Sequence, residues 1–306
     1  MNYFQEILNR AMRQCHETYS SLFDYIYPFT TENISGYINE FTLENRSLLT
    51  VGSSSDQVLN AILYGCENVT LLDINPYTKF YYYLKVACIL TLNKEEYLEF
   101  LRYYNYPKVF KDNKNCFNIE IFNKIKSTLL ILDYESYLFW CELFKNFSPL
   151  EIRKNLFSTD EDRTDIIVNS NPYLINEQAY KTLRKKLENV EPNFMTTNLL
   201  KDEVIGHFDN IWLSNIPQYL TTLEIKHLAD NTINALKHNG LMLISYLYQT
   251  TINTPYNKDW EPIYNLPQIL NLLKEYNPYL SSFLGVKGLK FKDEKIKDSI
   301  ILCRKL

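Results

Sequence analysis

One segment constrains the fold more than any other: two apolar runs separated by a polar turn and a helical pattern, with an acid after the second run. The pattern predicts a strand over about 47–52, a helix over about 55–65 and a second strand over 69–73. Asp73 lies 21 residues after Gly52. Doubly wound α/β folds use about this spacing to place a carboxylate on the ribose hydroxyls of an adenosine-type ligand.

The turn itself has the chemistry that such a ligand needs. The start of a helix offers backbone N–H groups without partners in the helix, and a turn of small residues lets a ligand approach them. The chain has only seven glycines, so Gly52 at the end of the first strand is informative. We therefore expect a ligand site at the carboxyl end of this strand.

The rest of the chain predicts helices and further strands. Helical spacing of apolar residues indicates helices within 1–27, near 33–41 and from Asn75 to about residue 91. The block over about 94–163 is helical and aromatic-rich, with helices near 95–103, 116–125, 127–144 and 149–156, and it has the length of an insertion or cap. Helices near 176–189, 221–236 and 266–276 alternate with strands near 193–198, 208–214, 241–247, 283–290 and 298–304.

This order predicts an α/β fold with a doubly wound, mostly parallel, seven-stranded sheet. The short link Lys292–Lys295 predicts that the last two strands form an antiparallel hairpin. We expect an N-terminal helical segment over 1–44 and one Rossmann-like domain over 45–306 that carries the insertion.

Composition narrows the classes of partner. The net charge of −4 argues against a nucleic-acid partner, which usually requires a basic face. The six cysteines have no C-x-x-C spacing and the four histidines have no ligand spacing, so we expect no metal site. No signal peptide is evident and no stretch approaches 18 uninterrupted apolar residues, so we expect a cytoplasmic protein without an integral membrane segment.

Over about 45–92 and 176–306, the order of elements with its terminal hairpin resembles the class I S-adenosylmethionine-dependent methyltransferase superfamily. Leu49–Asn60 with Asp73-Ile-Asn-Pro76, and Trp212–Leu220, are most similar to the betaine-lipid type 3-amino-3-carboxypropyl transferases and their uncharacterised relatives. The superfamily usually has two or three glycines in the first turn. Here one glycine precedes Ser53-Ser-Ser55, so the amino acid part of the cofactor would be held differently or not at all.

The resemblance implies S-adenosylmethionine as cofactor and assigns roles to residues near the strand ends. Its implied cofactor-binding residues are Gly52, Ser53, Asp56, Gln57, Asp73, Ile74, Asn75, Asn198 and Ser214. Each has a purely structural alternative: a serine-capped turn, first-turn helix residues favoured by the helix dipole, a helix cap at Asp73 or Asn75, or an Asx turn at Asn198.

On the acceptor side the candidates are fewer. Asn215 would border the transferring carbon, and Tyr219 and Tyr37 would line the acceptor site. Asn171-Pro-Tyr173 is similar to the Asn-Pro-Pro-Tyr box of nucleic acid amino-methyltransferases, but it lacks the second proline and precedes the wrong strand. We expect it to be structural.

The implied reaction is transfer of a methyl or a 3-amino-3-carboxypropyl group to a small-molecule, sugar or lipid acceptor. The alternative is a catalytically inactive cofactor-binding or scaffold protein of the same fold, which the loss of the glycine pattern favours. A nicotinamide-dependent oxidoreductase is disfavoured by the missing G-x-G-x-x-G and by the terminal hairpin. The sequence leaves the oligomeric state open.

Overall fold

The computed structural model describes residues 2–16, 25–102, 115–158, 163–216, 220–246 and 266–306. Contacts divide the chain into two compact units whose segments alternate along the sequence. The helical unit comprises Met1–Thr31, Gly52–Leu63 and Asp73–Val190, and the sheet unit comprises Glu32–Val51, Tyr64–Leu72 and Glu191–Leu306. The division into 1–44 and 45–306 stays a prediction.

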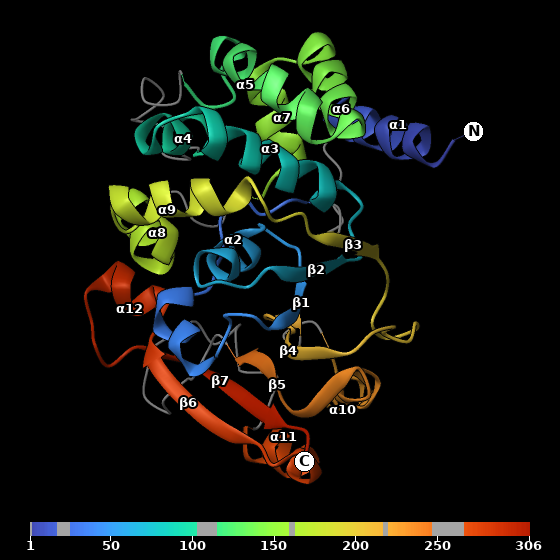
Figure 1. Cartoon of the computed structure of the whole chain (residues 1–306), viewed down its shortest axis with the longest axis vertical. Coiled ribbons are helices and arrows are strands. Elements are labelled where there is room, and N and C mark those ends of the chain that lie inside the picture. Colours follow the sequence, from blue (N-terminus) through green and yellow to red (C-terminus); the bar gives the residue numbers. More distant parts are fainter. Residues whose placement is uncertain (1, 17–24, 103–114, 159–162, 217–219, 247–265) are drawn as a thin grey trace. The chain divides into compact units, whose positions relative to one another are not determined.

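The described strands form one seven-stranded sheet (Figure 1). They are β1 Ser47–Val51, β2 Asn68–Asp73, β3 Asn193–Thr196, β4 Phe208–Trp212, β5 Leu236–Tyr246, β6 Tyr279–Leu284 and β7 Lys297–Arg304. Their spatial order is β3-β2-β1-β4-β5-β7-β6. β1 runs parallel to β2 and β4, β4 runs parallel to β5, and β7 runs antiparallel to both β5 and β6. This topology confirms the predicted doubly wound, mostly parallel, seven-stranded sheet with an antiparallel C-terminal pair.

The central strand explains why the first apolar run was a reliable signal. All five residues of β1 are buried, as expected for a parallel strand covered on both faces. Its register with β2 pairs Leu49 with Thr70, and its register with β4 pairs Leu49 with Ile211. The carboxyl ends of β1, β2, β4 and β5 therefore lie along one edge of the sheet.

The helices of the sheet unit are short apart from α10. They are η2 Ile34–Gly36, η3 Ile38–Glu40, α10 Thr222–Ile233, α11 Leu266–Leu272, η7 Lys274–Tyr276 and α12 Val286–Phe291. A capping box of Thr221 and Glu224 sets the start of α10. The single helix predicted near 33–41 is instead the pair of short 3₁₀ turns η2 and η3.

The last predicted strands needed correction. A strand was predicted over 283–290, but β6 ends at Leu284 and α12 occupies Val286–Phe291. The reason is a tertiary contact, since the backbone N–H of Val286 donates to Asp298 Oδ2 at 3.1 Å and turns the chain into a helix. A strand was predicted over 241–247, but β5 begins earlier, at Leu236, and includes Asn239 with a φ of +61°.

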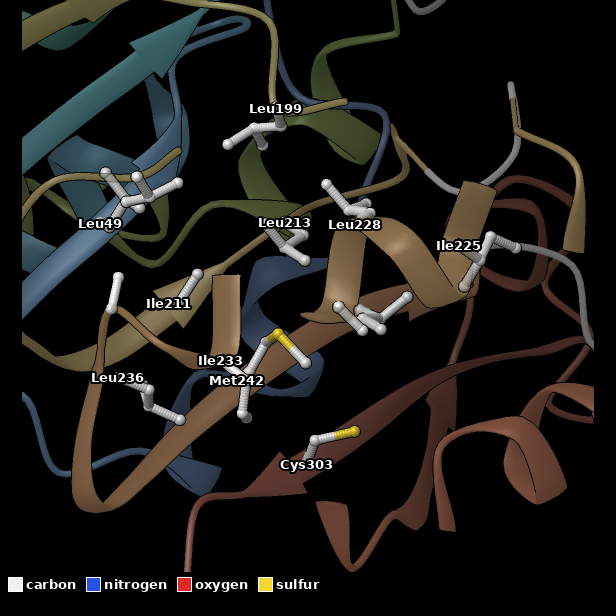
Figure 2. Packing of buried hydrophobic residues seen from close by; sticks show 14 of the residues in the cluster. Leu49, Leu199, Ile211, Leu213, Ile225, Leu228, Ile233, Leu236, Met242 and Cys303 are labelled. Carbon is white, nitrogen blue, oxygen red and sulfur yellow. The ribbon is translucent and has the colours of Figure 1, made fainter. Parts of the chain in front are cut away.

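The core of the sheet unit joins the sheet to α10. Ile225, Leu228 and Ile233 of α10 and Met242 of β5 belong to one buried cluster (Figure 2). These four side chains are buried, whereas Leu223 on the same helix is 79% exposed. α10 is therefore amphipathic, with one buried face and one exposed face.

The helical unit contains the remaining helices. They are α1 Tyr3–His16, α2 Asp56–Leu63, α3 Tyr77–Thr91, α4 Lys94–Leu101, α5 Ile119–Leu132, α6 Tyr134–Asn146, α7 Pro149–Leu156, α8 Thr164–Ser170, η5 Pro172–Leu174 and α9 Glu177–Leu187. α3 is buried along most of its length and packs against α5, α6 and α9. The break between α5 and α6 falls at Asp133, because its carboxylate accepts the backbone N–H of Ser136 and caps α6.

Within the described ranges, none of the helices has both the length and the apolar character that crossing a bilayer requires.

Replacing Leu228 by alanine should lower the free energy of unfolding by about 2–5 kcal/mol, because it leaves a cavity in the packed core. Leu223→Ala on the exposed face of α10 is the matched control and should change stability by less than about 0.5 kcal/mol. Urea unfolding of both variants measures the difference. Equal effects would show that α10 does not bury the face assigned to it.

Candidate functional site

The turn between β1 and α2 takes an unusual backbone for its sequence. Ser53 has a φ of +39° and Ser55 a φ of +66°, both in the left-handed region that favours glycine. The N–H of Ser55 donates to the carbonyl of Gly52 at 2.6 Å and closes the turn. Serines therefore take the conformation that glycines usually take at this junction.

Asp73, the last residue of β2, holds this turn. Its Oδ2 accepts the N–H of Ser53 at 2.7 Å and the hydroxyl of Thr78 at 2.9 Å, and its Oδ1 accepts the N–H of Asn75 at 2.9 Å. Burial raises the pKa of Asp73, and the N–H groups of Asn75 and Ser53 counteract part of that rise. The carboxylate thus connects the first turn to the start of α3, while part of its surface stays exposed.

Gly52 is required here by a close approach. A Cβ at this position would lie 2.3 Å from Thr78 Cγ2 and 3.3 Å from Asp73 Oδ2. Any larger residue would therefore push against the threonine that hydrogen-bonds Asp73.

The two residues after Asp73 differ in exposure. Ile74 is an apolar side chain that is 48% exposed. Asn75 is buried, and its Oδ1 accepts the N–H of Tyr77 at 2.9 Å, so it caps the start of α3. Asn75 therefore has the structural role that the sequence allowed as an alternative, that of a helix cap.

The first turn of α2 is buried. Gln57 is 2% exposed, and Asp56 has no exposed surface. The Asp56 carboxylate accepts hydrogen bonds from the backbone of Thr30 and from the side chains of Ser54, Lys85 and Tyr173. Asp56 is thus occupied by protein donors.

Ser55, in the same turn, has a different environment. Its hydroxyl is buried and has no hydrogen-bond partner among the described residues. A buried polar atom of this kind is costly unless something pairs with it.

In the sheet unit, Ser214 follows β4 with a φ of +52°. Its hydroxyl donates to Oε1 of Glu32, and its carbonyl accepts the N–H of Ser245 at 2.9 Å. Oε2 of Glu32 accepts the hydroxyls of Tyr37 and Ser245, each at 3.0 Å. Sequence reasoning missed Glu32, because no periodic pattern marks a single acid in an irregular connector.

Tyr37 is fully enclosed by this cluster. It is 1% exposed and its ring contacts Trp212 and Phe283. Burial and then the neighbouring Glu32 raise the pKa of Tyr37 well above its usual value, so the phenol stays protonated.

The remaining predicted residues are Asn198, Asn215 and Tyr219. Asn198 forms an Asx turn, with its Oδ1 accepting the N–H of Leu200 at 3.0 Å. Asn215 follows Ser214 and is partly exposed. Tyr219 lies outside the described residues.

The structure thus brings the predicted residues together in two groups. Gly52, Ser53, Asp73 and Asn75 meet in the helical unit, with Asp56 in the adjoining helix turn. Ser214 and Tyr37 meet through Glu32 in the sheet unit. In the portion of the chain that the structure describes, no group of three or more His, Cys, Asp or Glu side chains could hold a metal ion.

Asp298, at the start of β7, is a buried acid of the sheet unit. Burial first, and then the nearby charge of Glu32, raise the pKa of Asp298 to about 7. The N–H of Val286 and the charge of Lys287 oppose this rise.

No protein-family model matches the sequence, and no curated protein matches it significantly. Three solved structures with distant likeness illustrate the structural comparison. N-methyltransferase NodS from Bradyrhizobium japonicum, in complex with S-adenosyl-L-homocysteine, is 10% identical over 99% of this chain and 88% of its own, with a TM-score of 0.37.

Magnesium protoporphyrin IX methyltransferase (ChlM) from Synechocystis, with bound S-adenosylmethionine, is 10% identical over 100% of this chain and 85% of its own, with a TM-score of 0.40. A putative S-adenosylmethionine-dependent methyltransferase from Listeria monocytogenes is 7% identical over 87% and 93%, with a TM-score of 0.37. The fold assignment rests on the strand order and directions alone.

Gly52→Ala should destabilise the protein by about 1–3 kcal/mol, because the new methyl group collides with Thr78 Cγ2. Thr78→Ser removes that methyl group and keeps the hydroxyl that donates to Asp73. The double variant should therefore recover most of the loss in urea unfolding. Additive losses in the double variant would contradict the close approach.

Asp298 should make the protein less stable as the pH rises. Its pKa is about 7 in the folded protein against an ordinary value of 3.8, so the folded state holds the proton more tightly. This group alone should reduce the free energy of unfolding by on the order of 2–4 kcal/mol between about pH 4 and pH 7.

Asp298→Asn should flatten that part of the pH profile of urea unfolding. The exposed Asp293 provides a matched control, and Asp293→Asn should leave the slope unchanged. An unchanged slope in Asp298→Asn would show that this carboxyl is ionised in the folded protein well below pH 7.

Proposed function

We propose that the protein is an S-adenosylmethionine-dependent transferase that moves a methyl or 3-amino-3-carboxypropyl group to a small-molecule, sugar or lipid acceptor. The observation that carries the proposal is the 2.7 Å hydrogen bond from the N–H of Ser53 to Asp73. It joins the first turn of the fold to the acid of the second strand, the two features that hold an adenosine group in folds of this topology.

The residues around this bond fit an adenosine-containing ligand. Asp73 is partly exposed and accepts hydrogen bonds, which suits a ribose hydroxyl. Ile74 offers an exposed apolar side chain beside it, which suits the face of a purine ring. Gly52 and Ser53 present backbone at the N-terminal end of α2, and the unpaired hydroxyl of Ser55 offers a buried polar group in the same turn.

The bound cofactor would supply a sulfonium-activated carbon, so the chain itself needs no catalytic triad or carboxylate pair. The role of the protein would be to orient donor and acceptor and to exclude water. Ser214 and Asn215 follow β4 and are proposed to border the acceptor, with Tyr37 acting through Glu32. Asn198 is proposed to lie toward the adenine.

Asp56 takes a different part in this proposal from the one that the sequence suggested. Its carboxylate receives protein donors from four residues, so it would shape the turn and would not bind the amino acid part of the cofactor. The same observation favours a second candidate function, an inactive protein of this fold that retains the turn as scaffolding.

Calorimetric titration with S-adenosylmethionine separates the two candidates. We expect micromolar binding by the wild-type protein and loss of at least about tenfold in affinity with Asp73→Ala, because a charged acceptor is removed. Glu95→Ala removes an exposed carboxylate of the same unit and should bind as the wild type does. Absence of binding to both the cofactor and its demethylated product would exclude the enzyme and leave the scaffold.

Labelled cofactor then distinguishes the two transfers. Label on the methyl group would appear in the product of a methyltransferase, and label on the amino acid chain would appear in the product of an aminocarboxypropyltransferase. The candidate acceptors are the small-molecule, sugar and lipid classes named above.

A further inference from the structure

A buried lysine hydrogen-bonds the turn between β1 and α2, which the proposed function places against the cofactor. Lys85, on α3, has no exposed surface. Its ammonium donates to the carbonyl of Ser54 at 2.8 Å and to Asp56 Oδ1 at 2.6 Å, and it lies 4.7 Å from the centre of the Phe29 ring. An ammonium group is tolerated in such a place only when it is paired and hydrogen-bonded.

Asp56 in turn fixes the first residue of α2. Besides Lys85, its carboxylate accepts the Tyr173 hydroxyl at 2.8 Å, the N–H of Thr30 at 2.6 Å and the hydroxyl of Ser54 at 3.1 Å. A carboxylate has about four acceptor positions, so this one is filled by the protein.

Tyr173 belongs to the Asn171-Pro-Tyr173 segment that the sequence singled out. Asn171 Oδ1 accepts the side-chain N–H of Asn60 at 3.0 Å, and Asn60 Oδ1 accepts the N–H of Tyr173 at 3.1 Å. The hydroxyl of Tyr173 also shares a hydrogen bond with that of Tyr97 at 2.8 Å. The segment therefore hydrogen-bonds α2 at its first residue, Asp56, and in its second turn, at Asn60.

The turn between β1 and α2 needs these stabilising hydrogen bonds because its backbone is strained. A non-glycine residue in the left-handed region is strained, and Ser53 and Ser55 both lie there. Lys85 binds the carbonyl of Ser54, the residue between them. A second contact from α3 to the turn runs from Thr78 through Asp73 to the N–H of Ser53.

We propose that Lys85 and Tyr173 are positioning residues that hold the serine turn in its cofactor-binding shape and so replace the missing glycines. The proposal rests on the proposed function of the same turn. Neither side chain would touch the cofactor. Burial lowers the pKa of Lys85, and the charge of Asp56 and its hydrogen bond oppose this effect.

The test combines loss with a specific rescue. Lys85→Met should weaken the binding of S-adenosylmethionine by about tenfold or more, because the turn loses the hydrogen bonds from Lys85 to the carbonyl of Ser54 and to Asp56. Replacing Ser53 and Ser55 by glycine in that background should restore most of the affinity, because glycine adopts a positive φ without strain. A residue that only supported the core would not be rescued in this way.

Tyr173→Phe is the milder variant, in case Lys85→Met does not fold. It removes a single hydroxyl from Asp56 and should weaken binding by about three- to tenfold with a small change in Tm. Tyr180→Phe is its control, because Tyr180 is a buried tyrosine of the same unit whose hydroxyl donates to the carbonyl of Leu92. Wild-type affinity in both Tyr173→Phe and Lys85→Met, or failure of the glycine rescue, would overturn the proposal.

Hydrogen exchange at the amides of Ser53 and Ser55 gives a readout that needs no cofactor. Both amides are hydrogen-bonded in the turn, and Lys85→Met should expose them to exchange while those of α5 stay protected. Unchanged protection would overturn the positioning role. If the wild-type protein does not bind the cofactor at all, the proposed function fails, and exchange still decides whether Lys85 holds the turn.

Discussion

The left-handed backbone of the turn after β1 is the constraint on which the helical unit depends. Two serines occupy positions that favour glycine. They are held from one side by Asp73 and from the other by Lys85 with Asp56. These contacts come from α2, from α3 and from the end of β2. The shape of one turn therefore explains why Asp56, Asp73 and Lys85 are polar.

The sequence predicted elements well where the signal was local. The buried run of β1 and the acid that ends β2 were readable, because burial on both faces leaves a continuous apolar run. The strand predicted over 283–290 was wrong, because the contact from Val286 to Asp298 joins residues on two different elements and leaves no local pattern. For a similar reason the sequence did not reveal Lys85, which binds Asp56 29 residues away, or Glu32, which accepts a hydrogen bond from Ser214 182 residues away.

Two buried acids of the described chain have different partners. Asp56 is paired with a cation, and Glu32 is paired with hydroxyl groups. Asp56 is neutralised by an ammonium at 2.6 Å. Glu32 receives three hydroxyls, and its charge helps to raise the pKa of Asp298 to about 7. Asp298, with a pKa of about 7, links the packing of α12 and β7 to the proton concentration.

The alternation of the two units along the chain determines the order in which the protein can fold. β1 lies between β2 and β4, and residues 73–190 of the helical unit separate these two partners in sequence. β7 pairs with both β5 and β6. Several neighbouring strands of the sheet are thus far apart in sequence, and contacts of such long sequence separation slow folding.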